Sequence, residues 1–264
     1  MSVLDDINAA RRRTVAKVKA RRPPERLAAD VERFTRRPIS LASALRAGTG
    51  PRVIAEHKRA SPSEGDYGCP ADLPEVVRGY RAAGAVGLSV LTEGERFGGS
   101  LDHLREARAL VDLPLLRKDF IVDEYQLYEA RLAGADAVLL IASGLSPDEA
   151  HGFCRKAHEL QLEVLLELHG EDELDYLSIG PDVVGVNNRN LRTLAIDLAT
   201  SRRLLPLLPT DLPRLSESGI QTPADAADLL RIGYDGLLVG TQFMKSPDPG
   251  ATLGTFLAET VALL

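Results

Sequence analysis

From Arg52 onward, short leucine-rich or β-branched runs alternate with longer stretches in which apolar residues recur at helical spacing. Runs of the first kind predict buried strands, and stretches of the second kind predict amphipathic helices. Regular alternation of the two is typical of a parallel sheet built from strand–helix units. The predicted strands cover residues 53–58, 87–91, 113–118, 137–141, 163–168, 183–187, 213–218 and 236–240.

Helical stretches between these strands include residues 73–85, 124–137, 146–160 and 222–236. Gly84, Gly134 and Gly233 stand just before a strand, at the place where glycine commonly ends a helix. Because strand–helix–strand crossovers are right-handed, eight successive units close naturally into a barrel. We therefore predict an α/β protein with a (β/α)8 TIM-barrel fold in one domain over residues 1–264. A doubly wound open sheet is the alternative, ranked second because of the number of strands.

Residues 1–51 precede the first strand and predict an N-terminal helical extension. Apolar spacing indicates a helix over residues 4–19, Pro23 and Pro24 mark a break, and a second helical stretch covers residues 41–47. Such helices can plug the bottom of a barrel, pack on its side or cover its mouth. The first two roles are favoured over a lid.

Composition supports an ordinary soluble globule, because 44% of the residues are apolar and 27% are charged. A net charge of -6 argues against charge-driven binding to nucleic acid or to an anionic membrane. No apolar run is long enough to span a bilayer, and the basic N-terminus lacks the apolar core of a signal peptide. Cys69 and Cys154 are expected to be free thiols. The expectation is a cytoplasmic protein, a monomer or a weak homodimer, that binds a small molecule.

Charged and amide side chains gather at the ends of the predicted strands, where barrel enzymes carry their catalytic groups. Glu56 and Lys58 are two residues apart and so lie on one side of the first strand. Lys118 ends the third strand, Glu167 lies near the end of the fifth, and Asn187 ends the sixth. Any one of these would ordinarily be a solvated rim residue. Their convergence on one end of the barrel favours a catalytic site.

Other polar residues near these strand ends are expected to have structural roles. Asn188 and Asn190 are typical turn residues, and Arg189 either binds a substrate anion or pairs with a carboxylate, the second being favoured. Asp119 and His57 lie near the site without partners at metal-ligand spacing, so no metal is expected.

Two glycines near the end of the chain point to a phosphate. Gly219 and Gly240 follow the seventh and eighth strands, where backbone N–H groups can cradle a phosphate group. Either signal alone is an ordinary tight turn, but the pair is moderately specific in a barrel. The expected partner is therefore a phosphorylated small molecule.

Seven motifs, in order along the chain, resemble the indole-3-glycerol-phosphate synthase family: IAEHKRASPSEG, LSVLTEGERFGGS, LLRKDFIVDEYQ, VLLELH, GVNNRNL, ESGI and LLVGTQFM. The resemblance implies a (β/α)8 barrel with an N-terminal helical extension that acts in tryptophan biosynthesis. It implies ring closure of 1-(2-carboxyphenylamino)-1-deoxyribulose 5-phosphate to indole-3-glycerol phosphate, with loss of CO2 and water and without a cofactor or metal.

The resemblance also implies roles for individual residues. Its catalytic positions fall on Lys118, Glu167, Glu56, Lys58 and Asn187. Its substrate-binding positions fall on Ser61, Phe97, Phe120, Arg189, Glu217, Ser218, Gly219, Leu238, Gly240 and Thr241. Thr241 stands where the family often has serine, and His57 where it more often has an apolar residue; alternation along the strand should turn His57 away from Glu56 and Lys58.

Chemistry suggests how the charged positions divide the work. Lys118 is the expected acid at the ketone oxygen and Glu167 the expected base, with Glu56 as second choice. Lys58 either holds the substrate carboxylate or serves as the acid for dehydration. Phosphoribosylanthranilate isomerase, another phosphate-binding barrel and a non-catalytic sensor remain as alternatives; the isomerase would need a cysteine where the first strand has Glu56 and Lys58, and a sensor should have lost a catalytic charge.

Overall fold

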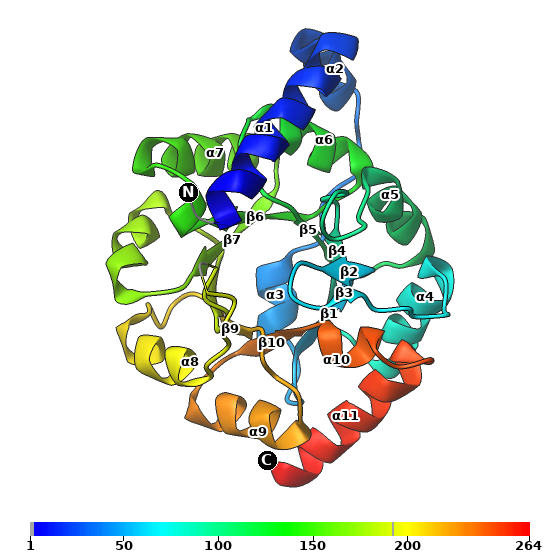
Figure 1. The fold of residues 1–264 in the computed structure, drawn as a ribbon, viewed down its shortest axis with the longest axis vertical. Helices are drawn as coiled ribbons and strands as arrows, with labels where there is room; N and C mark the ends of the chain where they lie inside the picture. The colour runs from blue at the N-terminus through cyan, green and yellow to red at the C-terminus, as the bar shows by residue number, and fades with distance from the viewer. Residues whose placement is uncertain (1–2, 192) are drawn as a thin grey trace.

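Eight parallel strands close into a barrel in the computed structural model, which describes residues 3–191 and 193–264 (Figure 1). The strand order is β1-β10-β9-β8-β7-β6-β5-β4, and β1 pairs with both β10 and β4. The open-sheet alternative is therefore wrong. All eight predicted strands are confirmed, with ends that shift by at most a residue or two: β1 Val53–His57, β4 Gly87–Leu91, β5 Leu115–Lys118, β6 Ala137–Ile141, β7 Glu163–Leu168, β8 Val183–Asn187, β9 Arg214–Glu217 and β10 Gly236–Val239.

Helices surround the barrel, and local sequence explains where they begin and end. Asp72, Ser146 and Thr222 each form a capping box that satisfies backbone N–H groups in the first turn of a helix. Gly84 and Gly134 end helices in the left-handed region, with φ of 101° and 88°. The outer helices are α4 Leu73–Ala83, α5 Leu101–Leu110, α6 Tyr125–Ala133, α7 Pro147–Glu159, α8 Ala199–Leu204, α9 Pro223–Ile232 and α11 Pro249–Leu263. Shorter helical segments are η1 Ala142–Gly144, η2 Glu171–Ile179, η3 Leu205–Leu207 and α10 Thr241–Met244.

The N-terminal extension holds three helices, α1 Val3–Arg21, α2 Pro24–Glu32 and α3 Leu41–Arg46. The sequence prediction took Pro23 and Pro24 as a break and missed α2. Pro24 occupies the first position of α2, where a missing N–H costs nothing, so the proline pair separates two helices and starts the second.

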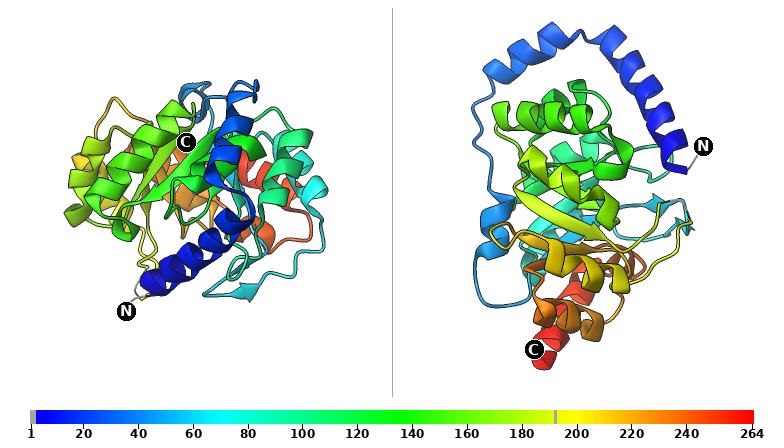
Figure 2. Two further views of the ribbon diagram at one scale, coloured as in Figure 1. Left: turned by 90° about the horizontal axis from the view of Figure 1, so that it is seen from above. Right: turned by 90° about the vertical axis from the view of Figure 1, so that its left-hand side faces the viewer.

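The extension reaches both ends of the barrel, and Figure 2 shows α1 and α3 on opposite sides of it. Leu41 and Leu45 of α3 are fully buried and pack with Ile54 and Leu116 inside the barrel bottom, as the plug interpretation expected. Helix α1 instead lies over the mouth, where Leu4 lines the central cavity. The preference against a lid was therefore wrong for α1.

A small hairpin, β2 Ala60–Ser61 and β3 Gly65–Asp66, stands in the loop after β1 and was not predicted from the sequence. Its strands are two residues long, too short for an alternating pattern to signal them. None of the helices in the described ranges is long and apolar enough to cross a membrane.

The buried plug predicts a large cost for truncating Leu45. Replacing Leu45 with alanine should lower the free energy of unfolding by about 2–5 kcal/mol, because a fully buried leucine leaves a cavity that its neighbours fill only in part. Urea unfolding followed by circular dichroism measures the change. Leu207→Ala is the matched control, because Leu207 is 46% exposed. Equal effects of the two substitutions would contradict the plug.

Candidate active site

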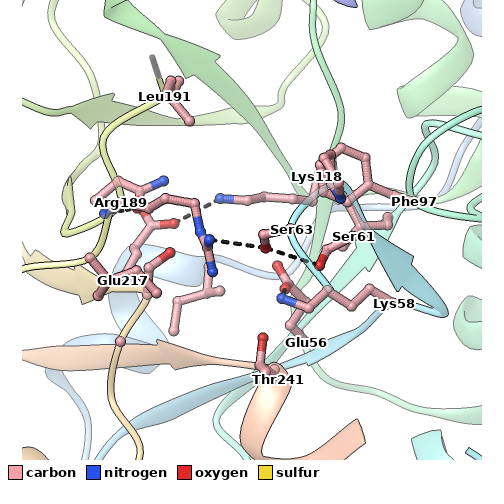
Figure 3. A pocket seen from close by; sticks show the side chains of 18 of the residues that line it. Glu56, Lys58, Ser61, Ser63, Phe97, Lys118, Arg189, Leu191, Glu217 and Thr241 are labelled. Carbon is pink, nitrogen blue, oxygen red and sulfur yellow. Dashed lines mark hydrogen bonds and ion pairs between the residues drawn. The ribbon is translucent and has the colours of Figure 1, made fainter. Parts of the chain in front are cut away.

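A cavity of about 260 Å³ opens at the carboxyl ends of the barrel strands. All the residues that the sequence singled out as catalytic or substrate-binding line it, although they come from seven of the eight strands and the loops after them. Figure 3 shows several of them pointing toward one another. The cavity is thus the one place where the predicted residues meet in the described part of the chain.

Lys118 lies between two carboxylates at the centre of this cavity. Its Nζ is 2.8 Å from Glu167 Oε2 and 2.8 Å from Glu217 Oε2. The three side chains end β5, β7 and β9, and the two glutamates are almost completely buried. Sequence reasoning placed Glu217 among the binding residues, whereas the geometry makes it a direct partner of Lys118.

The three groups set one another's protonation. Burial alone would lower the pKa of Lys118, but Glu167, Glu217 and Glu56 reverse this and hold its pKa above the usual value, so Lys118 is an ammonium. Burial would raise the pKa of Glu167, but Lys118 and then His169 hold that pKa well below its usual range. Burial raises the pKa of Glu217 to about 7, because Lys118 only partly offsets burial and Glu167 adds repulsion.

Space for Glu217 comes from a glycine inside a neighbouring strand. A Cβ at Gly185 of β8 would lie 2.1 Å from Glu217 Oε1, closer than any real contact. In the described residues Glu217 Oε1 also has no hydrogen-bond partner. Glycine in a strand interior often marks such a close approach, so Gly185 was a signal that the sequence interpretation did not use.

Glu56 and Lys58 form a second buried pair on β1 and the residue after it. Lys58 Nζ is 2.9 Å from Glu56 Oε1, and Ser89 donates to the other oxygen of Glu56 over 3.2 Å. Burial would raise the pKa of Glu56, but Lys58 and Lys118 lower it below its usual value. A Cβ at Gly240 would lie 2.7 Å from Glu56 Oε1, so a glycine is needed there too.

His57 turns away from this pair, as the alternation of side chains predicted. Its ring packs edge-on against His103 of α5, with 5.7 Å between ring centroids. Burial, together with repulsion from His103 and Arg59, lowers the pKa of His57 to about 4.

The segment after β8 contributes both a cavity wall and a structural anchor. Asn187 Oδ1 accepts a hydrogen bond from the Arg189 backbone N–H over 2.9 Å. The Arg189 side chain lies in the cavity and donates to Ser63 Oγ over 3.0 Å. The favoured pairing of Arg189 with a carboxylate is not found among the described residues. Asn188 is more than a turn residue, because its buried amide donates to the Ser216 hydroxyl and so ties β8 to β9.

One side of the cavity is apolar. The Phe97 and Phe120 rings lie 6.0 Å apart between centroids and are tilted by 38°. Leu238 is part of the same lining. Sequence reasoning missed further apolar contributors, among them those from the N-terminal helix and from the loop after β8: Val3, Leu4, Ile7, Leu191, Leu194 and Ile196.

Other parts of the lining carry hydroxyls and the loops after β9 and β10. Ser218 and Gly219 both adopt left-handed backbone conformations, with φ of 66° and 79°. Tyr67, which the sequence did not single out, donates to Ser61 Oγ over 3.0 Å and lies 3.2 Å from Thr241 Oγ1. This part of the lining therefore offers hydroxyl donors, with Lys58 and Arg189 close to them.

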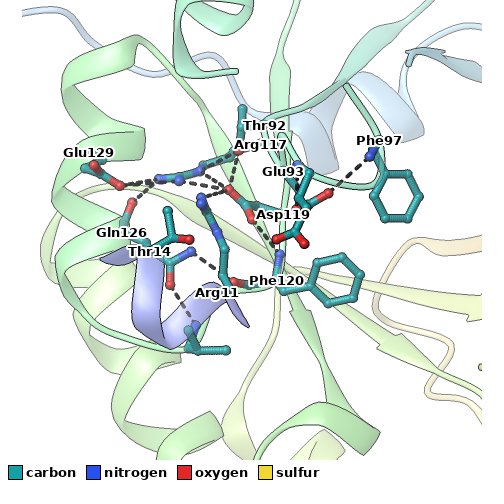
Figure 4. Close-up of polar contacts among 12 residues, drawn as sticks. Arg11, Thr14, Thr92, Glu93, Phe97, Arg117, Asp119, Phe120, Gln126 and Glu129 are labelled. Atoms are coloured by element: carbon teal, nitrogen blue, oxygen red, sulfur yellow. Dashed lines mark hydrogen bonds and ion pairs between the residues drawn. The ribbon is translucent and has the colours of Figure 1, made fainter. Parts of the chain in front are cut away.

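Asp119 attaches helix α1 to the barrel and has no assigned role in catalysis. Arg11 of α1 lies 2.5 Å from Asp119 Oδ2, which also accepts from Arg117 over 2.9 Å and from the Thr92 hydroxyl (Figure 4). Arg117 and Asp119 flank Lys118 in sequence and face away from it. Residues next to Lys118 therefore hold the helix that covers the cavity.

Comparisons with known proteins show what this chain is similar to. A family model described as indole-3-glycerol phosphate synthase matches residues 4–256. An indole-3-glycerol phosphate synthase of Bacteroides thetaiotaomicron is 51% identical over 205 residues, which cover 78% of this chain and 79% of that protein. One of Rhodopirellula baltica is 44% identical over 251 residues, which cover 94% of this chain and 96% of that protein.

Among solved structures, a thiamine phosphate pyrophosphorylase from Pyrococcus furiosus matches with a TM-score of 0.61 at 16% identity. The match covers 85% of this chain and 100% of that one, and it supports the barrel fold alone. The family model and the two synthases, by contrast, match in sequence over most of the chain. The chain therefore belongs to the indole-3-glycerol phosphate synthase family.

Proposed function

We propose that this chain closes the indole ring of indole-3-glycerol phosphate, starting from 1-(2-carboxyphenylamino)-1-deoxyribulose 5-phosphate and releasing CO2 and water. The observation that carries the proposal is the buried ammonium of Lys118, held between Glu167 and Glu217 inside the cavity. The reaction builds and then removes negative charge on one oxygen, and it needs both an acid and a base within one enclosed site.

Lys118 acts first, at the ketone. The aromatic carbon that bears the carboxylate attacks the ketone carbon, and a new C–C bond forms as the carbonyl π electrons move to oxygen. Lys118 donates a hydrogen bond and then a proton to that oxygen, which becomes a hydroxyl group. Loss of the carboxylate as CO2 returns its bonding electrons to the ring and restores aromaticity.

Glu167 acts in the dehydration that follows. The hydroxyl group leaves as water after taking a proton from an acid, and a base removes a proton from the new ring to form the double bond. Glu167 is ionised at neutral pH and is the first choice for the base, with Glu56 second. Lys58 either supplies the proton for the leaving hydroxyl or holds the substrate carboxylate, and Asn187 orients a substrate hydroxyl.

The two ends of the cavity suit the two ends of the substrate. The anthranilate ring fits between Phe97, Phe120 and the apolar wall that α1 completes. Backbone N–H groups at Gly219 and Gly240 are proposed to hold the phosphate, with hydroxyls from the surrounding loops beside them. The hydroxyls belong to Ser61, Ser218 and Thr241. Arg189, inside the cavity and without a carboxylate partner in the described residues, is free to meet a substrate anion.

The cellular setting is part of the proposal. We expect a protein of the cytoplasm that is a monomer or a weak homodimer, and its net charge of -6 argues against binding to nucleic acid. Sedimentation velocity at micromolar concentration tests the oligomeric state, and a stable larger assembly would contradict it.

Removing either central charge should abolish most turnover. Lys118→Met and Glu167→Gln are each expected to lower kcat by about 100-fold or more, because each removes the proton donor or acceptor placed first for its step. Formation of indole-3-glycerol phosphate is followed by its indole fluorescence, and circular dichroism confirms that each variant is folded.

The exposed pair Lys156 and Glu159 on α7 provides matched controls, since it joins the same two residue types far from the cavity. Lys156→Met and Glu159→Gln should turn over at the rate of the unmodified protein. Near-normal product formation by Lys118→Met or Glu167→Gln would sink the assignment.

Glu217 should make substrate binding depend on pH. The other four charged groups of the cluster cancel, so the cluster is neutral when Glu217 is protonated and carries one negative charge when it is ionised. With a pKa of about 7, Glu217 ionises as the pH rises from 6 to 8 and then repels an anionic substrate. KM should rise over this interval, by up to about tenfold for one group.

Glu217→Gln cannot ionise and isolates this effect from titration of the substrate phosphate. Steady-state kinetics at fixed ionic strength should show a clearly flatter dependence of KM on pH for Glu217→Gln than for the unmodified protein. Parallel curves for the two proteins would show that Glu217 does not titrate in this interval.

A further inference from the structure

The carboxylate of Glu167 has two oxygens, and the Lys118 ammonium donates a hydrogen bond to only one of them. Oε2 accepts from Lys118, whereas Oε1 lies 3.2 Å from Nε2 of His169, the second residue after it in the chain. This contact has ion-pair distance, although it is not a well-aligned hydrogen bond. Because the Glu167 side chain is 2% exposed, its second oxygen depends on a protein partner rather than on bulk water.

The far side of the His169 ring meets another carboxylate. Nδ1 of His169 lies 3.4 Å from Oε2 of Glu173, and the backbone N–H of His169 donates to the same oxygen over 2.7 Å. Glu173 belongs to η2, whose first turn is closed by a hydrogen bond from the Glu173 N–H to the Gly170 carbonyl. The segment after β7 therefore presents Glu173 to the ring and fixes the ring's orientation.

From these contacts we propose that His169 is a positioning residue, an imidazolium clamped between Glu167 and Glu173 that orients the Glu167 carboxylate and keeps it ionised. The proposal rests on the proposed function, in which Glu167 is the base. His169 is not among the described residues that line the cavity, so it acts on substrate through Glu167.

Electrostatics agree with the geometry. Burial would lower the pKa of His169, but the carboxylates of Glu167 and Glu173 raise it to about 9, so the ring carries a proton on both nitrogens at neutral pH. The titratable groups that face the ring are Glu167 from β7 and Glu173 from η2; Lys118 lies beyond them on the far oxygen of Glu167. Glu171, on the same turn as Glu173, is exposed and pairs with Arg203.

The His169 imidazolium should lower the pKa of the Glu167 carboxyl group. A cation beside a carboxylate lowers the pKa of that carboxylate, and His169 is second only to Lys118 in doing so for Glu167. Removing the imidazolium should raise the pKa of Glu167. A base must be ionised, so activity should then begin to fall at a higher pH as the solution is acidified.

Kinetics of two variants test the proposal. His169→Ala should lower kcat roughly 10- to 100-fold, as loss of a residue that orients a reacting group does, with KM changed less than about twofold. The acid limb of its kcat profile should move to higher pH. His169→Gln keeps an N–H donor but not the charge, so it should recover part of kcat without restoring the acid limb.

A histidine–carboxylate pair at the other end of the barrel provides the matched control. His158 of α7 lies 2.9 Å from Asp182, the residue before β8, and both are outside the cavity. His158→Gln removes a histidine–carboxylate contact of the same kind and should leave kcat and its pH profile unchanged. An unchanged kcat and acid limb in a folded His169→Ala variant would overturn the proposal, as would loss of activity through KM alone.

A second measurement does not depend on turnover. Histidine side-chain NMR should show His169 titrating near pH 9 in the unmodified protein. In Glu167→Gln and in Glu173→Gln its pKa should fall toward the ordinary histidine value of about 6.5, because each variant removes one facing carboxylate. An unshifted His169 pKa in both variants would overturn the clamp. Absence of product from the unmodified protein would instead overturn the proposed function and leave this titration as a separate result.

Discussion

One ammonium shared by two buried carboxylates is the interaction around which the site is organised. Burying Lys118, Glu167 or Glu217 alone would be costly, because an unpaired charge loses its hydration without compensation. Each is instead placed within 2.8 Å of a partner that lies 49 or 99 residues away in sequence. A closed barrel meets this requirement, since the ends of β5, β7 and β9 all converge on one mouth. One ammonium cannot fully offset the burial of two carboxylates. The pKa of Glu217 is therefore raised to about 7, close to neutral pH.

The N-terminal segment packs against the barrel at both of its ends. Strand alternation sends Lys118 into the cavity and its neighbours Arg117 and Asp119 outward, where Asp119 holds Arg11 of α1. The helix that covers the cavity is thus fastened to the very strand that carries the ammonium. At the other end of the barrel, α3 fills the bottom with leucines, so one N-terminal segment contributes to both ends. The two glutamates of the cluster are almost completely buried, and electrostatic interactions are stronger where water is scarce.

Local patterns predicted the barrel and the charged residues Glu56, Lys58, Lys118 and Glu167 at its mouth, whereas the family resemblance supplied others that line the cavity, such as Ser61, Phe97 and Phe120. Buried strands have short apolar runs, and a charge such as Glu167 after three apolar residues stands out against that background. Helix α2 was not predicted, because a proline pair indicates a break in the chain as readily as the start of a helix. The sequence analysis did not single out Tyr67, Leu4 or His169, for another reason. Each contributes to the site only through contacts with other side chains, and the sequence does not specify those contacts. Glu217 was found but understated, because its partner Lys118 lies across the barrel.

The central proposal is that the Lys118 cluster closes an indole ring and releases a carboxylate as CO2. Its most direct test is to incubate the purified, unmodified protein with 1-(2-carboxyphenylamino)-1-deoxyribulose 5-phosphate, without added metal or cofactor, and to measure indole fluorescence and released CO2 together. The account predicts that both appear with the same time course and in equal amounts. Tight binding of the phosphorylated compound with neither signal would contradict it and would favour a barrel that only senses such a ligand.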